Sequence, residues 1–164
     1  MARYSYSKLN WTPVAVADTT AFTDNGYIAV LGGNTTMRIE FSEVYMGGLA
    51  ASSAPAQMIV ARDSTIGATS LTGVLSAALD GAGVAPGTLA SAFSASTTKP
   101  QRSSTLQILQ LGFNAFGGVV RWVAPPGAEF SLVGSTASLG EISLSSGSAG
   151  TPGLMSAHFI GDIK

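Results

Sequence analysis

Residues 36–46 read TMRIEFSEVYM, and the alternation of apolar and polar side chains in this stretch decides the fold class. From 37 to 41 the apolar residues fall on odd positions, which is the two-residue period of a strand with one buried face. After position 43 the period reverses, and the apolar residues take even positions. One extra residue near Ser42–Glu43 would return both halves to one face, so the sequence predicts a strand with a β-bulge there.

Residues 105–113 (TLQILQLGF) show the same reversal. Leu106 and Ile108 share one parity, whereas the apolar residues from Leu109 onward take the other. A shift of one residue within a strand is typical of a bulged bend at the corner of a sandwich. We therefore expect a second bulge or sharp bend near Ile108–Leu109.

Further short apolar runs, separated by Gly, Pro, Ser and Asn, are predicted to be strands: 27–31, 57–62, 119–124, 130–133, 141–144 and 155–160. Turn sequences flank 27–31, so 27–46 is predicted to form a hairpin. The run 57–62 is apolar on both parities, which predicts a central strand covered on both faces. Together these strands predict an all-β fold, an antiparallel β-sandwich of jelly-roll-like type.

The segment 64–100 is rich in Ala, Gly, Ser and Thr and poor in large apolar and charged residues. It cannot bury a core of its own, so it is predicted to be a long excursion from the sandwich with one or two short helices. Apolar residues at spacings of three and four favour a helix over 70–79, against the cost of Gly73 inside it. A second helical turn is expected over 89–93. The predicted organisation is an N-terminal arm over 1–13 and a single domain over 14–164.

The composition excludes several classes of protein. The chain has 164 residues, 8 basic and 9 acidic, so its net charge of −1 does not favour nucleic-acid binding. It has no cysteine, which excludes disulfides and thiol chemistry. The long uncharged stretches lack the strongly apolar composition of a membrane span, and 1–11 lacks the apolar core of a signal peptide.

No constellation of residues indicates catalysis, a cofactor or a metal ion. His158 is the single histidine and no Gly-x-Ser-x-Gly motif occurs, so His158 is interpreted as a structural or surface residue. Glu40 and Glu43 are close in sequence, but an exposed strand gives no cause for the raised pKa that a glycosidase acid needs. Asp18 and Asp24 are either calcium ligands or turn-forming acids, with the turn favoured. We therefore predict a protein that is not an enzyme and has no catalytic, cofactor-binding or metal-binding residues.

Aromatic residues concentrate in the N-terminal arm, which holds Tyr4, Tyr6 and Trp11 together with the apolar Leu9. Aromatic side chains are enriched at interface hot spots, so one hypothesis makes these four residues an attachment surface. The alternative is that 4–9 is a first strand that completes the sandwich. Arg121-Trp122 has two interpretations as well: a stacked cation–π surface for a sugar or partner, or a core aromatic in a strand.

Scattered phrases of the chain are similar to those of a known group of proteins: Glu43-Val44-Tyr45-Met46-Gly47-Gly48, Ala61-Arg62-Asp63-Ser64, Lys99-Pro100-Gln101-Arg102-Ser103, Asn114-Ala115-Phe116-Gly117-Gly118, Arg121-Trp122 and Gly150-Thr151-Pro152-Gly153. Over residues 27–160 the chain resembles short, largely uncharacterised structural proteins of tailed bacteriophages. The phrases are short and contain no catalytic signature. The resemblance gives no role to any individual residue.

The resemblance implies a virion protein, made in the host cytoplasm, that decorates or cements the capsid by binding the major capsid protein lattice. The low charge agrees with close packing of many copies, and we expect a homo-oligomer, most simply a trimer on a symmetry axis. The alternative is a receptor- or glycan-binding β-sandwich of a phage fibre or tail, which exposed Trp or Tyr in a shallow groove would favour. An enzyme is the third and least favoured class.

Overall fold

The computed structural model describes residues 2–11, 27–32, 38–66, 68–73, 75–79, 90–98, 100–133, 141–148 and 154–164. Within these ranges the chain forms twelve strands: β1 (Ala2–Trp11), β2 (Tyr27–Gly32), β3 (Arg38–Gly48), β4 (Pro55–Thr65), β5 (Ala68–Gly73), β6 (Leu75–Ala78), β7 (Ala90–Thr98), β8 (Gln101–Asn114), β9 (Val119–Val123), β10 (Phe130–Val133), β11 (Glu141–Ser148) and β12 (Met155–Ile163).

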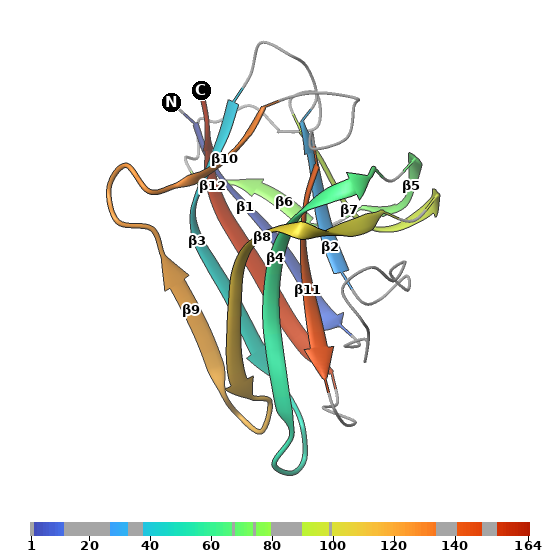
Figure 1. Cartoon of the computed structure of the whole chain (residues 1–164), viewed down its shortest axis with the longest axis vertical. Coiled ribbons are helices and arrows are strands. Elements are labelled where there is room, and N and C mark those ends of the chain that lie inside the picture. The colour runs from blue at the N-terminus through green and yellow to red at the C-terminus, as the bar shows by residue number, and fades with distance from the viewer. Residues whose placement is uncertain are drawn as a thin grey trace.

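The strands form two antiparallel sheets that pack face to face (Figure 1). Sheet A has the order β10-β3-β12-β1-β6, with β9 also paired to β3, and sheet B has the order β5-β7-β2-β11-β4-β8. Successive strands repeatedly change sheet, as from β2 to β3 and from β3 to β4, which is typical of jelly-roll-like sandwiches. The predicted antiparallel sandwich is confirmed.

The bulge predicted in the opening stretch is present. In the pairing of β3 with β12, Ile160 lies opposite Glu43 and Gly161 lies opposite Phe41, so Ser42 is the extra residue. The inserted residue lets the apolar side chains on both sides of it reach the same core, as the reversal of parity predicts.

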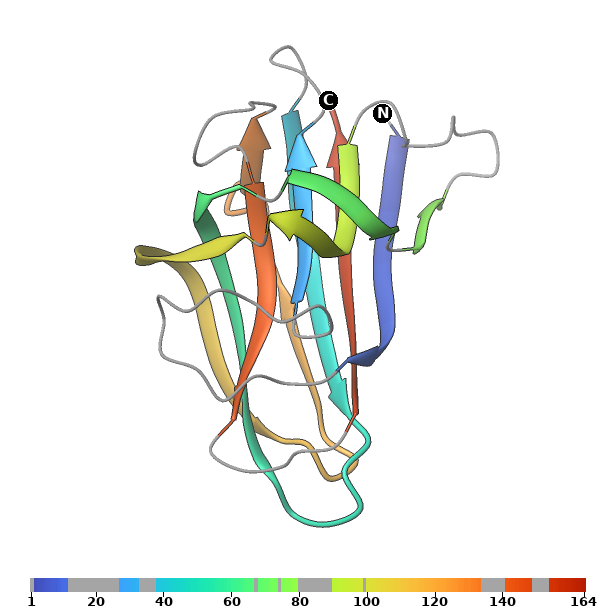
Figure 2. The ribbon, with the colours of Figure 1, turned by 90° about the vertical axis from the view of Figure 1, so that its right-hand side faces the viewer.

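The second bulge is present as well. Between β4 and β8, Val60 lies opposite Leu109 and Ala61 lies opposite Gln107, which leaves Ile108 as the extra residue. Two more register shifts follow before Thr65. Figures 1 and 2 show β8 (yellow to brown) turning sharply along its length, with β4 turning beside it. The bulged strand therefore bends at a corner of the sandwich, as the prediction required.

The predicted hairpin over 27–46 is wrong, because β2 and β3 belong to different sheets. In sheet B, β2 pairs with β11 on one side and with β7 on the other. Ala29 and Val30 are both buried, so β2 is an inner strand whose two edges are already occupied. The turn sequences mark where the chain leaves the strand, but they do not decide which strand becomes its partner.

The helix predicted over 70–79 and the turn over 89–93 are also wrong for the described residues. The strand β5 pairs with β7, β6 pairs with β1, and β7 pairs with β2. Gly73 and the many Thr and Ser residues disfavour helix, while the open edges of both sheets supply backbone partners. The described parts of the segment 64–100 therefore extend both sheets: β6 lies at the edge of sheet A, and β5 and β7 lie at one side of sheet B. No helix able to cross a membrane occurs among the described residues.

The other strand predictions agree with the structure. The run 57–62 lies in β4 between β11 and β8, and its residues from Met58 to Ala61 are buried, so it is the predicted central strand. The runs 119–124, 130–133, 141–144 and 155–160 correspond to β9, β10, β11 and β12.

An aromatic cluster lies at the centre of the core between the sheets. Phe41 packs on Phe130 and Phe159 with ring centroids 5.4 and 5.0 Å apart, and Trp122 packs on Phe130 at 5.1 Å. A Cβ atom at Gly161 would lie 3.0 Å from the Phe41 ring. Gly161, which lies beside the first bulge, therefore leaves room for the Phe41 ring that a side chain at this position would crowd.

Candidate interaction surfaces

The N-terminal segment 2–11 is an inner strand of sheet A. In β1, Tyr4 lies opposite Gly161 and Tyr6 opposite Phe159, while the other edge pairs with β6. The backbone thus forms the sheet-completing strand that the alternative hypothesis proposed. The described structure does not extend to the side chains of Tyr4, Tyr6, Leu9 and Trp11, so their role as an interface stays a prediction, as does the division at residue 13.

His158 lies on the outer face of sheet A. Its ring meets the edge of the Tyr45 ring, with centroids 5.6 Å apart. Burial lowers the pKa of His158, and the charge of Glu43 opposes that shift. Burial thus favours the neutral form of the imidazole. Asp18 and Asp24 lie outside the described residues, so their interpretation as ion ligands stays untested.

Glu43 is the acceptor of a small exposed network on the same face. The Tyr45 hydroxyl donates to Glu43 Oε2 at 2.5 Å, and Arg121 donates to the same atom from Nη2 at 2.7 Å. The bond to Glu43 raises the pKa of Tyr45. The Arg121 guanidinium also lies over the Tyr45 ring, 5.2 Å from its centroid. The cation–π partner of Arg121 is therefore Tyr45, whereas Trp122 is a core aromatic.

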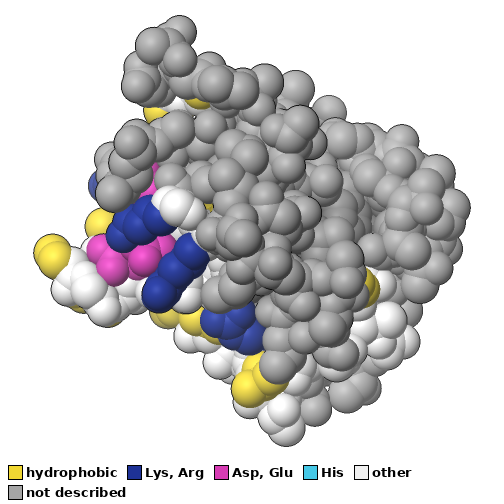
Figure 3. Space-filling view, turned by 90° about the horizontal axis from the view of Figure 1, so that it is seen from above, with side chains coloured by type: hydrophobic (Ala, Val, Ile, Leu, Met, Phe, Trp, Pro, Cys, Tyr) yellow, Lys and Arg dark blue, Asp and Glu magenta, His cyan; other side chains and the backbone are white. Residues whose placement is uncertain are grey.

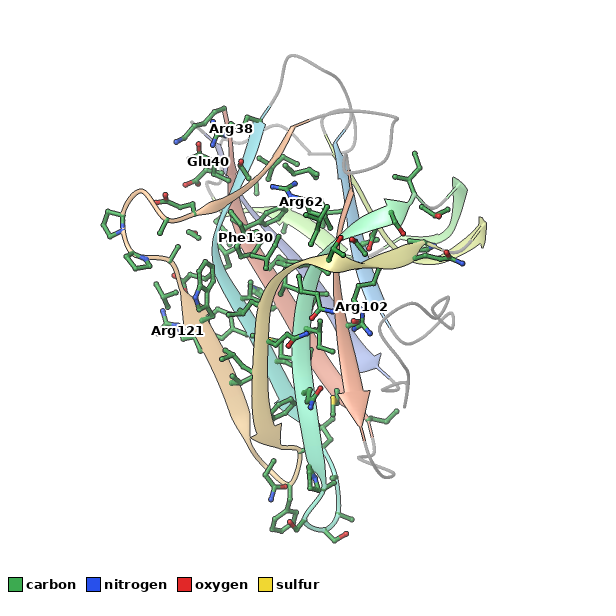
Figure 4. All side chains as sticks on the ribbon, viewed as in Figure 1. Arg38, Glu40, Arg62, Arg102, Arg121 and Phe130 are labelled. Atoms are coloured by element: carbon green, nitrogen blue, oxygen red, sulfur yellow. The ribbon has the colours of Figure 1, made fainter. Side chains whose placement is uncertain are left out.

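Glu40 precedes Glu43 in β3 and lies between the cationic side chains of Arg38 and Lys164. Arg38 Nε is 3.3 Å from Glu40 Oε1, and Lys164 Nζ contacts Glu40 Oε2. Figure 4 shows Arg38 and Glu40 together near the end of the sandwich that carries the termini, with Arg121 lower on β9. Figure 3, a view onto this end, shows acidic side chains between basic ones. Glu40 and Glu43 thus take part in separate ion pairs.

A buried polar cluster links three strands of sheet B. Ser143 Oγ donates to Asp63 Oδ1 at 2.6 Å, and Arg102 Nη1 donates to Ser145 Oγ at 2.9 Å. Asp63 and Arg102 lie opposite each other in the register of β4 and β8. Sequence analysis did not single out this cluster. The cluster joins β4, β8 and β11, so its hydrogen bonds hold these three strands in register.

Exposed apolar side chains gather at the end of the sandwich opposite the termini, at the bottom of Figure 1. We call this end the tip and define it as residues 48–55, 114–119 and 154. It exposes Leu49 by 60%, Phe116 by 59%, Val119 by 70% and Leu154 by 44%. These four exposed apolar side chains make the tip a candidate surface for protein contact.

Hydrogen bonds hold the tip together. Leu49 N donates to Leu154 O at 2.8 Å and Gly48 N to Gly118 O at 3.0 Å, which ties β3 to β12 and β9. The Asn114 side chain completes the network: its Oδ1 accepts from Ala54 N at 3.1 Å and Phe116 N at 3.0 Å, and its Nδ2 donates to Ser53 Oγ at 2.9 Å.

Glycines let the strands of the tip approach closely. A Cβ atom at Gly48 would lie 2.2 Å from the carbonyl oxygen of Ala115, and one at Gly118 would lie 1.9 Å from that of Asn114. Gly117 has a φ of 63°, which L-residues with side chains rarely adopt. These contacts and the hydrogen bonds make the tip a preorganised surface.

The tip also carries no charge. The segments 44–61, 103–120 and 142–161 contain no Lys, Arg, Asp or Glu. The register brings all three to one end, because Ser148 lies opposite Ala56 and Met155 lies opposite Gly48. Asn114 lies opposite Pro55 at the same end. The gaps in charge are visible in the sequence, but their convergence depends on the sheet topology, so sequence analysis missed the tip.

Comparisons with known proteins add little to this geometry. No protein-family model matches the chain, and no curated protein matches it. Among solved structures, the chain is similar to the VP1 pentamer of human polyomavirus 7, with 14% identity and a TM-score of 0.32 over 98% of this chain and 94% of that one. A likeness at this score carries no argument about this chain.

Proposed function

We propose that this protein is a non-enzymatic structural protein of a virion, which decorates or cements a bacteriophage capsid by binding the major capsid protein lattice. The observation that supports the proposal most is the tip, an exposed, apolar and preorganised surface suited to protein contact. The resemblance of the sequence phrases to structural proteins of tailed phages supplies the kind of assembly. The proposal includes assembly as a homo-oligomer, most simply a trimer.

The environments of the ionisable groups support a non-enzymatic role. Glu40 and Glu43 each lie against cations, and burial favours the neutral form of His158 beside Tyr45. Charged or neutral groups held in these ways serve packing and ion pairing.

The alternative function, a glycan- or receptor-binding module, would use an exposed aromatic platform. Among the described Tyr and Trp side chains, Tyr45 carries the Arg121 guanidinium over one ring face and Trp122 packs on Phe130. The exposed aromatic ring at the tip is that of Phe116. A glycan array would test this alternative directly, and saturable binding of one glycan class would favour it over the capsid.

Sedimentation with phage particles tests the proposed function. The purified full chain is mixed with capsids that lack it, and the pelleted protein is counted per particle. We expect saturation at a number of copies set by the symmetry of the lattice, with no binding to an unrelated shell. Copies that never pellet with capsids, or that pellet without saturation, would overturn the proposal.

A further inference from the structure

We propose that the tip is the contact between copies of this chain: the tip of one protomer docks on the tips of its neighbours around a shared axis. The inference rests on the proposed function, because it takes the tip to be a protein interface. It deepens that function by naming the occupant as a second copy and by placing the symmetry axis at the uncharged end.

The absence of charge at the tip restricts what can occupy it. Any charged group placed against the tip would lose its water without gaining an ionic partner there, and an unpaired buried charge is strongly unfavourable. The partner surface must therefore be uncharged and apolar. The tip itself has this composition over 48–55 and 114–119, so a second copy supplies a matching surface in every encounter.

The rigidity of the tip favours association. Binding loses free energy when mobile loops and side chains must be ordered, and preorganised surfaces avoid most of that loss. The backbone bonds from Leu49 and Gly48, and the three bonds of the Asn114 side chain, fix the loops before any partner arrives. Leu49 and Phe116 are then presented as anchors whose burial supplies the driving force.

The charged groups lie at the end of the sandwich away from the proposed contact. Arg38, Glu40 and Lys164 form ion pairs at the opposite end. Figure 4 labels Arg38 and Glu40 there. Copies that meet at their tips keep these ends apart and in water. The net charge of −1 adds little repulsion between protomers.

Sedimentation equilibrium of the full chain over a wide range of concentrations tests the inference. Leu49→Lys and Phe116→Lys each place a charge at the tip on an exposed side chain, so both variants should fold normally by circular dichroism. Leu106→Lys is the matched control, since Leu106 is an exposed leucine of β8 outside the tip. We expect an oligomer for the wild type and the control, and a dissociation constant raised about tenfold or more in each tip variant.

The remaining outcomes separate the occupants. A wild type that is monomeric at every concentration, or a control that dissociates as much as the tip variants, overturns the inference. Tip variants that stay oligomeric but no longer pellet with capsids also overturn it and assign the tip to the shell, with the proposed function intact. Binding of the monomeric wild type to phosphatidylcholine vesicles, lost in Leu49→Lys, would assign the tip to a membrane and overturn it as well. Monomeric tip variants that still pellet with capsids support it and place the shell contact elsewhere.

Discussion

The two ends of this sandwich differ in what holds them and in what they expose. At the end with the termini, Glu40 pairs with Arg38 and Lys164, whose side chains are 55% and 42% exposed, and ion pairs with exposed cations stabilise a fold weakly. At the tip, close glycine contacts and amide hydrogen bonds hold loops that expose Leu49 and Phe116. Close backbone contacts and hydrogen bonds therefore fix the shape of the tip, whereas the opposite end is held by weak ion pairs and presents charged groups to water.

The largest expected effect comes from filling the closest contact of the tip. In Gly48→Ala the new Cβ atom would meet the backbone of Ala115, which cannot rotate away. We expect the free energy of unfolding in urea to fall by about 3 kcal/mol, as for overpacking in a core. Gly112→Ala is the control, because a Cβ atom at Gly112 meets nothing within 4 Å. Equal effects of the two substitutions would show that the close approach at Gly48 is unimportant.

The next effect tests the hydrogen bonds of the tip. Asn114→Ala removes the acceptor of two backbone amides, those of Ala54 and Phe116. We expect a loss of about 1–3 kcal/mol in the free energy of unfolding, because each amide loses its partner. Hydrogen exchange at these two amides should accelerate in the variant. Ser53→Ala, which removes only the bond from Asn114 Nδ2, should cost less.

Much of this architecture follows from parity in the sequence. Both bulges lie where the apolar period reverses, with Ser42 and Ile108 as the inserted residues. The alternation of apolar and polar residues is a local signal, because every strand with one buried face needs it whichever strand lies beside it. That is why these two positions could be predicted without knowing the partners of either strand.

Strand partners and the tip could not be predicted in the same way. The hairpin over 27–46 failed because local turn residues do not tell whether the next strand joins the same sheet. The predicted helix over 70–79 is wrong because this segment has a weak helix propensity and its backbone pairs with free edges of the two sheets. The tip unites three uncharged segments, and only the register of β3, β4, β8, β11 and β12 brings them together.

At the charged end we expect a small effect. Glu40→Gln removes the partner of Arg38 and Lys164, and the free energy of unfolding should fall by less than about 1 kcal/mol. The difference from the wild type should shrink further in high salt, because salt screens exposed pairs. A loss as large as that of Gly48→Ala, or one independent of salt, would contradict the contrast between the two ends.

The smallest effect concerns His158, which lies between the two ends on sheet A. Burial lowers its pKa in the folded protein, so the unfolded chain binds a proton first as the pH falls below about 6.5. The stability that neutral His158 contributes is present above that pH and lost as the pH falls through the folded pKa. His158→Gln should therefore flatten the difference in unfolding free energy between about pH 7 and 5. A wild type that gains stability relative to the variant on acidification would contradict this.

The central claim, that the tip is a buried contact between protomers, is tested most directly by thiol reactivity. The chain has no cysteine, so Ser52→Cys places a single thiol on the exposed tip and Lys164→Cys places one at the charged end. The rate constant of alkylation is measured for each variant in dilute and in concentrated solution. We predict that concentration slows the reaction at position 52 and leaves the rate at position 164 unchanged. Equal rates at position 52 in dilute and concentrated protein, or slowing at position 164 alone, would contradict the claim.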